Sequence, residues 1–225
     1  MTLAHGPSLY YNNLILWYDF ASAVSYTNGT TVNDLSGSAN TGTFSAATTV
    51  GGGYAQFAGT TNITTTTQFN NPQVFSLSIW FNTTSTTGKK LVGFETNQTS
   101  LVGGNYDRQY IVDTTGNLYY AIYTGALTTY SYGTANTGTW YNAVVSTNNG
   151  SINHYLNGVL IGSSSGTAQN LVGWWRIGGY RTQAWPNTSD GYFTGNVGPV
   201  MVWNTALTTA QVTQTYNAIK GRFGL

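Results

Sequence analysis

Short segments that alternate between apolar and polar residues recur along the chain, and a period of two residues predicts β-strands. The segment FSLSIWF, residues 75–81, places Phe75, Leu77, Ile79 and Phe81 on one face of such a strand. Gly, Asn and Thr interrupt these segments at close spacing, which is typical of an all-β sandwich or jelly roll with antiparallel strands. Further strands are expected at residues 108–113, 117–123, 140–147 and 197–203.

Two hairpins are expected from the turns between strands. Residues 108–113 and 117–123 are joined through Thr114–Asn117. In residues 152–162, Asn157-Gly158 fits a type I′ turn, because both central residues of that turn need a positive φ. The Thr-rich stretch 60–69 is β-prone and is interpreted as strand or loop. No linker divides the chain, so residues 14–225 are expected to form one domain behind an N-terminal arm, residues 1–13.

One short helix is predicted near the C-terminus, within residues 207–223. Thr208 is the expected N-cap, and Gln211, three residues later, completes a capping box. Gly221 suits the left-handed position that follows a helix. The apolar stripe expected to face the sandwich consists of Val212, Tyr216 and Ile219.

The amino-acid composition excludes several classes of protein. With 225 residues, 40% hydrophobic and 15% aromatic, it can bury a sizeable core. It has no cysteine, which excludes disulfides and thiolate chemistry. Charged residues make up 6% and the net charge is +1, so we expect neither a nucleic-acid partner nor binding to anionic lipids. No apolar run approaches the length of a membrane span, so we expect no membrane insertion.

Several segments resemble, in the same order, the laminin-G-like jelly roll of the concanavalin A-like lectin and glucanase superfamily. The resemblance covers nearly the whole chain from about Leu14 and implies two facing antiparallel sheets. The segments that carry it are LILWYDF with the turn NDLSG, FSLSIWF, residues 106–125, TWYNAVVST, YLNGVLIGSSSG, WWRIGG and residues 195–223.

One segment near each end of the chain is similar to a narrower group of proteins within this superfamily. NDLSG and the closing TYNAIKGRFGL are similar to lectin-like domains in structural proteins of tailed bacteriophages. This implies a non-enzymatic protein on the virion surface, either a capsid decoration protein or a fibre component, that aids adhesion to host or environmental glycans. The first 20 residues lack the basic region and long apolar core of a secretory signal, which fits assembly inside a cell and later exposure. The alternative is a secreted or cell-surface carbohydrate-binding module, located outside the cell.

Catalysis is disfavoured by the carboxylates and histidines of the chain. The resembled glucanases carry their facing carboxylates on one strand, whereas Glu95 is the one glutamate here and has no aspartate near it in sequence. The two histidines are His5, in the arm, and His154, which alternates with Tyr155 in a hairpin strand and is interpreted as structural. We therefore expect no enzymatic activity, and a glucanase is the disfavoured alternative.

Calcium is the one cofactor that the resemblance suggests, because lectins of this superfamily often hold it through oxygen ligands. Asp34 with Asn40, or Asp107 with Asp190, are candidate ligands. No cluster of acidic residues accompanies them, and Asp34 in NDLSG equally suits a turn. The metal site is therefore left open.

The stretch NLVGWWRIGGYRTQAW, residues 170–185, concentrates aromatic and arginine side chains. Trp175 is expected in the core, with Trp174 on the opposite strand face. Tyr180, Arg181 and Trp185 follow in a long loop, and Tyr, Arg and Trp are frequent in binding hot spots. Trp174, Tyr180, Arg181 and Trp185 are therefore candidates for contact with a glycan or a partner protein. For Trp185 the alternative is that it holds its loop against the domain.

The arm carries three apolar residues, Leu9, Tyr10 and Tyr11. We predict that they attach the protein to a viral capsid or tail protein. Proteins on particle surfaces sit around symmetry axes, so a homo-oligomer is expected.

Overall fold

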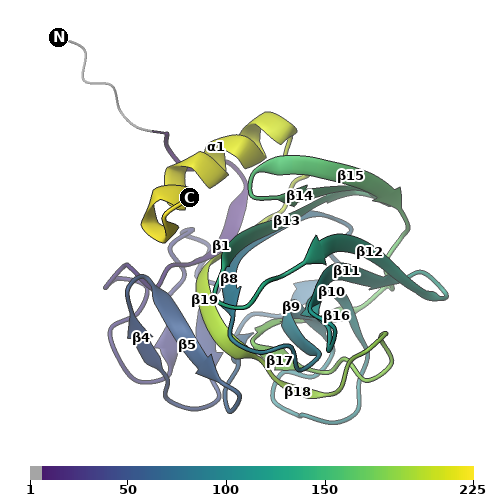
Figure 1. Cartoon of the computed structure of the whole chain (residues 1–225), viewed down its shortest axis with the longest axis horizontal. Coiled ribbons are helices and arrows are strands. Elements are labelled where there is room, and N and C mark those ends of the chain that lie inside the picture. Colours follow the sequence, from purple (N-terminus) through teal and green to yellow (C-terminus); the bar gives the residue numbers. More distant parts are fainter. Residues whose placement is uncertain (1–6) are drawn as a thin grey trace.

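The computed structural model describes residues 7–225, which form two antiparallel β-sheets packed face to face (Figure 1). Residues 1–6 of the predicted arm, His5 among them, lie outside the described residues. The predicted β-sandwich and its C-terminal helix are confirmed. Within residues 7–225, no helix is long and apolar enough to cross a membrane.

Sheet A is the sheet against which the helix packs. From edge to edge it consists of β15 (Val159–Ser165), β14 (Ser151–Leu156), β13 (Trp140–Asn148), β8 (Val74–Thr83), β19 (Thr194–Trp203), β5 (Tyr54–Ala58) and β4 (Thr49–Gly51), and β1 (Leu14–Tyr18) also pairs with β19.

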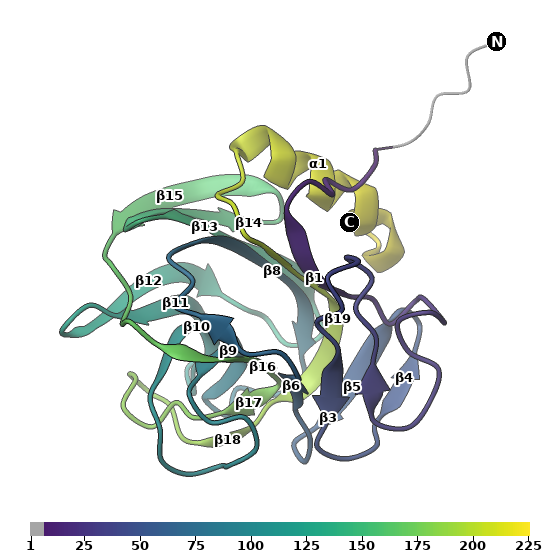
Figure 2. The ribbon, with the colours of Figure 1, turned by 180° about the vertical axis from the view of Figure 1, so that it is seen from behind.

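Sheet B faces sheet A across the core, and Figure 2 shows its β3, β6 and β16 side by side. From edge to edge it consists of β12 (Leu127–Thr134), β11 (Asn117–Tyr123), β10 (Tyr106–Val112), β9 (Lys89–Glu95), β16 (Val172–Ile177), β6 (Ile63–Thr65), β3 (Gly42–Phe44) and β2 (Thr31–Val32), and β7 (Phe69–Asn70) also pairs with β16. A separate pair is formed by β17 (Gly179–Tyr180) and β18 (Gly191–Tyr192).

The alternation along β8 explains how the core forms. Phe75, Leu77, Ile79 and Phe81 all point into the main apolar cluster between the sheets, as predicted. The opposite face of β8 is buried as well, because Trp80 lies in a second cluster beneath the C-terminal helix. Strands of both sheets contribute to the main cluster, which holds the sandwich together by removing apolar surface from water.

Both predicted hairpins are present. β10 pairs with β11, and β14 pairs with β15. Asn157 and Gly158 have φ values of 50° and 77°, as the type I′ turn requires. Addition of a Cβ at Gly158 would place it 2.6 Å from the Tyr216 ring, so this position needs glycine for space as well.

The helix α1 (Thr209–Ile219) continues into the 3₁₀ turn η1 (Lys220–Phe223). The predicted capping box between Thr208 and Gln211 is confirmed. The prediction that Gly221 ends the helix in the left-handed conformation is wrong, because Gly221 lies within η1 and Gly224 takes that conformation, with φ of 72°. The 3₁₀ turn brings Phe223 onto Trp80, with ring centroids 4.9 Å apart.

The segment before β1 lies against the domain. Leu9 and Tyr10 are partly buried against the cluster beneath α1, and the Tyr10 carbonyl accepts a 3.0 Å hydrogen bond from Trp203 Nε1. Tyr11 is 55% exposed and meets the Trp17 ring edge to face. All three predicted attachment residues thus contact their own domain, Leu9 and Tyr10 with partly buried side chains, and a role in attachment stays a prediction.

Candidate functional site

The aromatic residues of the stretch 170–185 are divided between the core and the surface of the protein. Trp175 is buried in the main cluster, as expected, and Trp174 is half-buried on the outer face of sheet B. Trp185 is 3% exposed and packs on Ile111 and Tyr119. The buried ring packs its loop against the domain, which is the alternative kept open for Trp185, and contact of Trp185 with a glycan or a partner protein stays a prediction.

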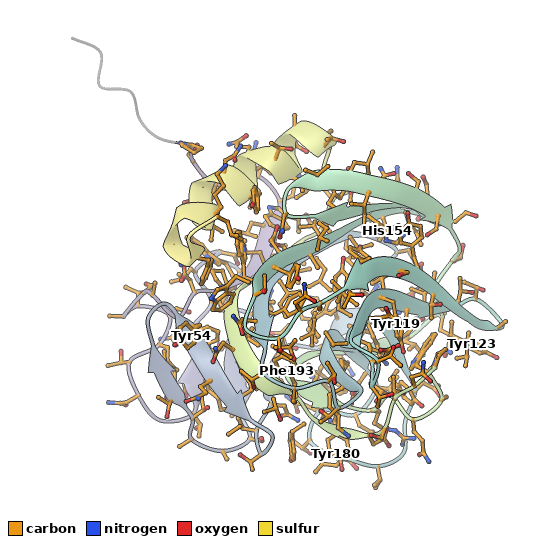
Figure 3. All side chains as sticks on the ribbon, viewed as in Figure 1. Tyr54, Tyr119, Tyr123, His154, Tyr180 and Phe193 are labelled. Atoms are coloured by element: carbon orange, nitrogen blue, oxygen red, sulfur yellow. The ribbon has the colours of Figure 1, made fainter. Side chains whose placement is uncertain are left out.

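Tyr180 and Arg181 are each partly exposed. The Tyr180 ring lies edge to face against Tyr192, with centroids 5.3 Å apart (Figure 3 labels Tyr180). The Arg181 guanidinium stacks on the Tyr106 ring at 5.0 Å and donates to the Gly103 carbonyl. Tyr180 therefore lies beside Tyr192, while Arg181 links its own loop after β17 to the loop that contains Gly103.

Two loops fold over the outer face of sheet B. The β9–β10 loop comprises residues 96–105, and the β17–β18 loop comprises residues 181–190. Arg176, on the outer face of β16, is 1% exposed and donates to the carbonyls of Asn97, Gln98 and Ser100 in the first loop. Trp185 packs the second loop onto β10 and β11. The sheet face that these loops leave uncovered lies toward β3 and β6.

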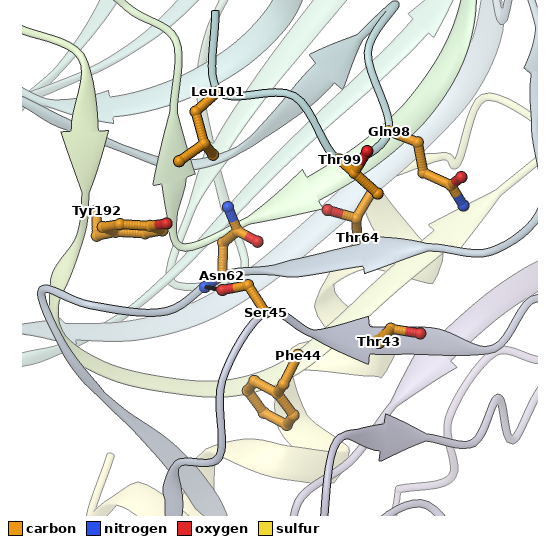
Figure 4. A pocket seen from close by; sticks show the side chains of 9 residues that line it. All are labelled: Thr43, Phe44, Ser45, Asn62, Thr64, Gln98, Thr99, Leu101 and Tyr192. Carbon is orange, nitrogen blue, oxygen red and sulfur yellow. Dashed lines mark hydrogen bonds between the residues drawn. The ribbon is translucent and has the colours of Figure 1, made fainter.

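A pocket of about 450 Å³ opens at this position (Figure 4). We call it the Asn62 pocket. Its floor is the outer face of β3 and β6, since Thr43 and Thr64 pair directly there and Thr64 pairs with Arg176. The β9–β10 loop forms one wall and Tyr192 of β18 another. The residues that line it are Thr43, Phe44, Ser45, Asn62, Thr64, Gln98, Thr99, Leu101 and Tyr192.

Asn62 is the one lining residue of the pocket with a buried polar side-chain atom that finds no partner among residues 7–225. It is 3% exposed, and its Nδ2 has no hydrogen-bond partner within the described residues 7–225, although its backbone N–H donates to Ser45 Oγ at 3.1 Å. A buried donor left without a partner costs about 1–3 kcal/mol. The Asn62 side chain extends into the pocket between Ser45 and Leu101 (Figure 4). An acceptor on a bound molecule would remove this cost.

Three buried charged side chains, Lys90, Glu95 and Arg176, form a cluster beside the β9–β10 loop. Glu95 lies between Lys90 and Arg176, with Arg176 Nη1 3.0 Å from Glu95 Oε2 and Lys90 in contact with Oε1. All three side chains are at most 2% exposed. Burial lowers the pKa of Lys90 to about 8, although Glu95 opposes the shift. Because its charge is balanced, Arg176 can keep the carbonyls of the β9–β10 loop in place.

Neither the pocket nor this cluster was predictable from a local pattern in the sequence. The sequence alone assigned no role to Lys90 or Arg176. A weak signal existed, because the charged residues Lys90 and Glu95 flank the apolar segment LVGF within one strand. Asn62 lies in the Thr-rich stretch and Tyr192 is 130 residues away in sequence, so no local pattern relates them.

A smaller hollow of about 180 Å³ lies at the other end of the covered face. Tyr106, Tyr123 and Trp185 line it together with Asn105, Leu127, Gln169 and Ala184.

The candidate calcium ligands are engaged by hydrogen-bond donors. Asp34 accepts from the backbone N–H groups of Trp17, Ser36 and Asn40. The Asp107 carboxylate accepts from the backbone of Tyr123 and of Gln169, and that of Asp190 accepts from the backbone of Thr182 and of Gln183. Over residues 7–225, no three or more His, Cys, Asp or Glu side chains gather as a metal site would require. Asp34 is a turn former here, and calcium stays an untested expectation.

Comparison with known proteins supports the architecture. Residues 51–213 match the family model described as the concanavalin A-like lectin/glucanases superfamily. No curated protein sequence matches the chain significantly.

Solved structures share the fold at low sequence identity. Domain 4 of AbnA, a GH43 extracellular arabinanase from Geobacillus stearothermophilus, in complex with arabinotriose, is 19% identical, with a TM-score of 0.62 over 91% of this chain and 98% of that chain. The binding domain of Paraclostridial Mosquitocidal Protein 1 is 14% identical, with a TM-score of 0.66 over 92% and 52% of the two chains. Trypanosoma rangeli sialidase in complex with sialic acid is 12% identical, with a TM-score of 0.69 over 93% and 33%.

The chain thus spans about half of the toxin binding domain and a third of the sialidase. Its family model covers well over half of the chain, and the two facing sheets are those the resemblance implied. The protein belongs to the concanavalin A-like lectin/glucanase superfamily.

Proposed function

We propose that the protein is a non-enzymatic carbohydrate-binding module and that the Asn62 pocket is its binding site. The observation that carries this proposal is the unpartnered Nδ2 of a buried asparagine inside an open pocket. The fold supports it, because the arabinanase domain with the same fold is described in complex with arabinotriose.

The lining of the pocket suits a sugar. Tyr192 and Leu101 offer apolar surface for the C–H faces of a sugar ring, as aromatic and aliphatic walls do in many ligand sites. Hydroxyl groups of Thr43, Ser45 and Thr99 stand beside them as small donors and acceptors. A site with one apolar wall and several neutral polar groups matches the mixed surface of a saccharide.

The absence of a carboxylate from this lining supports a binding role over hydrolysis. Glycoside hydrolysis uses two carboxylates that flank the scissile bond. The residues around the Asn62 pocket include none, and Glu95, the one glutamate of the chain, is paired with Lys90 and Arg176.

A glycan array followed by calorimetric titration tests the proposal. Tyr192→Ala should raise the Kd of the best glycan about tenfold, since loss of a ring contact is worth about 1.4 kcal/mol. Tyr123→Ala, in the smaller hollow, is the matched control and should bind as the wild type does. If no glycan binds, or if Tyr192→Ala binds normally, the Asn62 pocket is not a carbohydrate site.

We propose further that the module acts outside the cell, on the surface of a virion, as a capsid decoration protein or fibre component that aids adhesion to glycans. The phage-like segments NDLSG and TYNAIKGRFGL and the weakly charged, hydroxyl-rich composition support this setting. Tyr11, 55% exposed beside Trp17, is the proposed contact with a capsid or tail protein. Mass spectrometry of purified particles tests the setting, and Tyr11→Ala should lower the copy number without lowering the melting temperature. Recovery of the chain only as a soluble protein would favour the secreted module.

A further inference from the structure

The Asn62 pocket has features that select among sugars, and the following inference rests on the function proposed above. Charge is the first feature. Its nine lining residues are Thr, Ser, Asn, Gln, Phe, Leu and Tyr, none of which is ionised at neutral pH. A carboxylate moved from water into such a site loses hydration without gaining a counter-ion, which disfavours acidic sugars.

The cations near the pocket are already engaged. Arg176 is buried and paired with Glu95. Lys89 Nζ donates to Ser189 Oγ and to the Asp190 carbonyl, each at 2.7 Å. Arg181 donates to the Gly103 carbonyl and lies 3.7 Å from Asp190 Oδ2. Recruitment of any of these groups by an anionic ligand would break contacts that hold the surrounding loops, so the pocket is suited to a neutral ligand.

The second feature is the direction of the unmet hydrogen bond. Asn62 Nδ2 is a donor, so a bound ligand must present an acceptor to it. Amide carbonyl oxygens are strong acceptors that carry no proton of their own, whereas a sugar hydroxyl is both donor and acceptor. The buried donor therefore favours a carbonyl over a hydroxyl.

The third feature is the apolar surface beside this donor. Leu101 and Tyr192 line the same pocket as Asn62, and Figure 4 shows Leu101 above Asn62 and Tyr192 to its left. A hydroxymethyl or hydroxyl group placed there would lose water without finding a partner. A methyl group placed there would instead gain from leaving water.

A carbonyl next to a methyl, on an uncharged ring, is an acetamido group. We propose that the Asn62 pocket binds a neutral N-acetylated hexosamine, whose acetamido carbonyl accepts a hydrogen bond from Asn62 Nδ2. The acetamido methyl group packs against Leu101, and the sugar ring lies against Tyr192. Thr43 and Thr99 hydroxyls are available to the remaining polar groups of the ring.

The test is titration of the full chain with methyl glycosides of N-acetylglucosamine, N-acetylgalactosamine, glucose, galactose and sialic acid, followed by calorimetry or ligand-observed NMR. We expect at least one N-acetylhexosaminide to bind about tenfold or more tightly than the matching hexoside, and sialic acid to bind most weakly. Asn62→Leu should abolish the preference for the acetylated sugar. Since Leu replaces a buried, unpartnered amide by an apolar group of similar shape, its melting temperature should not fall.

Asn105→Leu, at the smaller hollow, is the matched control and should keep the wild-type preference. Equal affinity for hexosides and N-acetylhexosaminides overturns the inference and leaves carbohydrate binding standing. Tighter binding of sialic acid than of the N-acetylhexosaminides, or an unchanged preference in Asn62→Leu, also overturns the inference and leaves carbohydrate binding standing. Failure of every sugar to bind overturns both this inference and the proposed function.

Discussion

His154 should make the protein sensitive to mild acid. Its side chain is fully buried between the sheets at the β12 and β14 side of the sandwich (Figure 3), with its ring stacked on Tyr130 at 3.8 Å. Tyr132 Oη lies 3.0 Å from Nδ1, and Ser164 Oγ lies 2.7 Å from Nε2. No acidic side chain of residues 7–225 hydrogen-bonds to the ring. Burial accordingly lowers the pKa of His154 from 6.5 to about 4.

The magnitude follows from proton linkage. Between pH 6.5 and pH 4 the unfolded chain carries a proton on His154 that the folded chain does not bind, so the free energy of unfolding falls as pH falls. The slope approaches about 1.4 kcal/mol per pH unit, and the loss between pH 7 and pH 5 is about 2 kcal/mol. Below the folded pKa of about 4 both states are protonated and this contribution changes no further.

Urea denaturation at pH 7, 6 and 5 measures the effect. The chain has two histidines, so few other groups titrate in this window. His5→Gln should keep the full loss, whereas His154→Phe should remove most of the pH dependence even if its stability at pH 7 is lower. A wild-type loss below about 0.5 kcal/mol would refute the reasoning, as would an undiminished loss in His154→Phe.

Four further predictions follow from contacts described above. Arg176→Lys keeps the charge but not the forked donor, so we expect a loss of about 1–3 kcal/mol and faster amide exchange at residues 97–101; unchanged exchange there would contradict the anchoring role of Arg176. Phe223→Ala removes stacking on Trp80 and Trp140 and should cost about 2 kcal/mol in urea denaturation, which a loss under about 0.5 kcal/mol would disprove. Gly178→Ala places a Cβ 2.2 Å from Phe57 Cε1, at a backbone φ of 81°. It should lower the melting temperature far more than the control Gly125→Ala, where φ is 96° but the space around the residue is open. Equal losses in the two variants would show that backbone strain alone decides the effect. Calcium and EDTA should leave the melting temperature of the protein unchanged, because the candidate carboxylates accept backbone N–H groups, and a calcium-dependent rise would reveal a site that the sequence left open.

Local patterns predicted the elements well because their causes are local. The alternation in residues 75–81 places four side chains in the core, and the Asn157-Gly158 turn needs two positive φ values that few residues adopt. The Thr208 capping box joins groups three residues apart. The helix end was misjudged, since packing of Phe223 on Trp80 favours one more 3₁₀ turn over a stop at Gly221.

The candidate site was not predictable in the same way, because its parts are distant in sequence. Asn62, Leu101 and Tyr192 meet only after β6, the β9–β10 loop and β18 are assembled. Trp185 was one of four candidates in the sequence, and its exposure depends on whether its loop turns outward or packs on Ile111 and Tyr119. A residue type that is frequent in binding sites does not reveal which way a loop turns.

The anchoring of the β9–β10 loop separates ligand preference from stability. Gln98, Thr99 and Leu101 supply a pocket wall, whereas the atoms that Arg176 holds are backbone carbonyls, which every residue type has. Side chains of the wall can therefore be exchanged during evolution while the loop keeps its course, and the core between the sheets is not disturbed. Substitutions at Gln98, Thr99 and Leu101 should therefore reshape the Asn62 pocket without unfolding the domain, because the buried arginine holds the loop by its backbone.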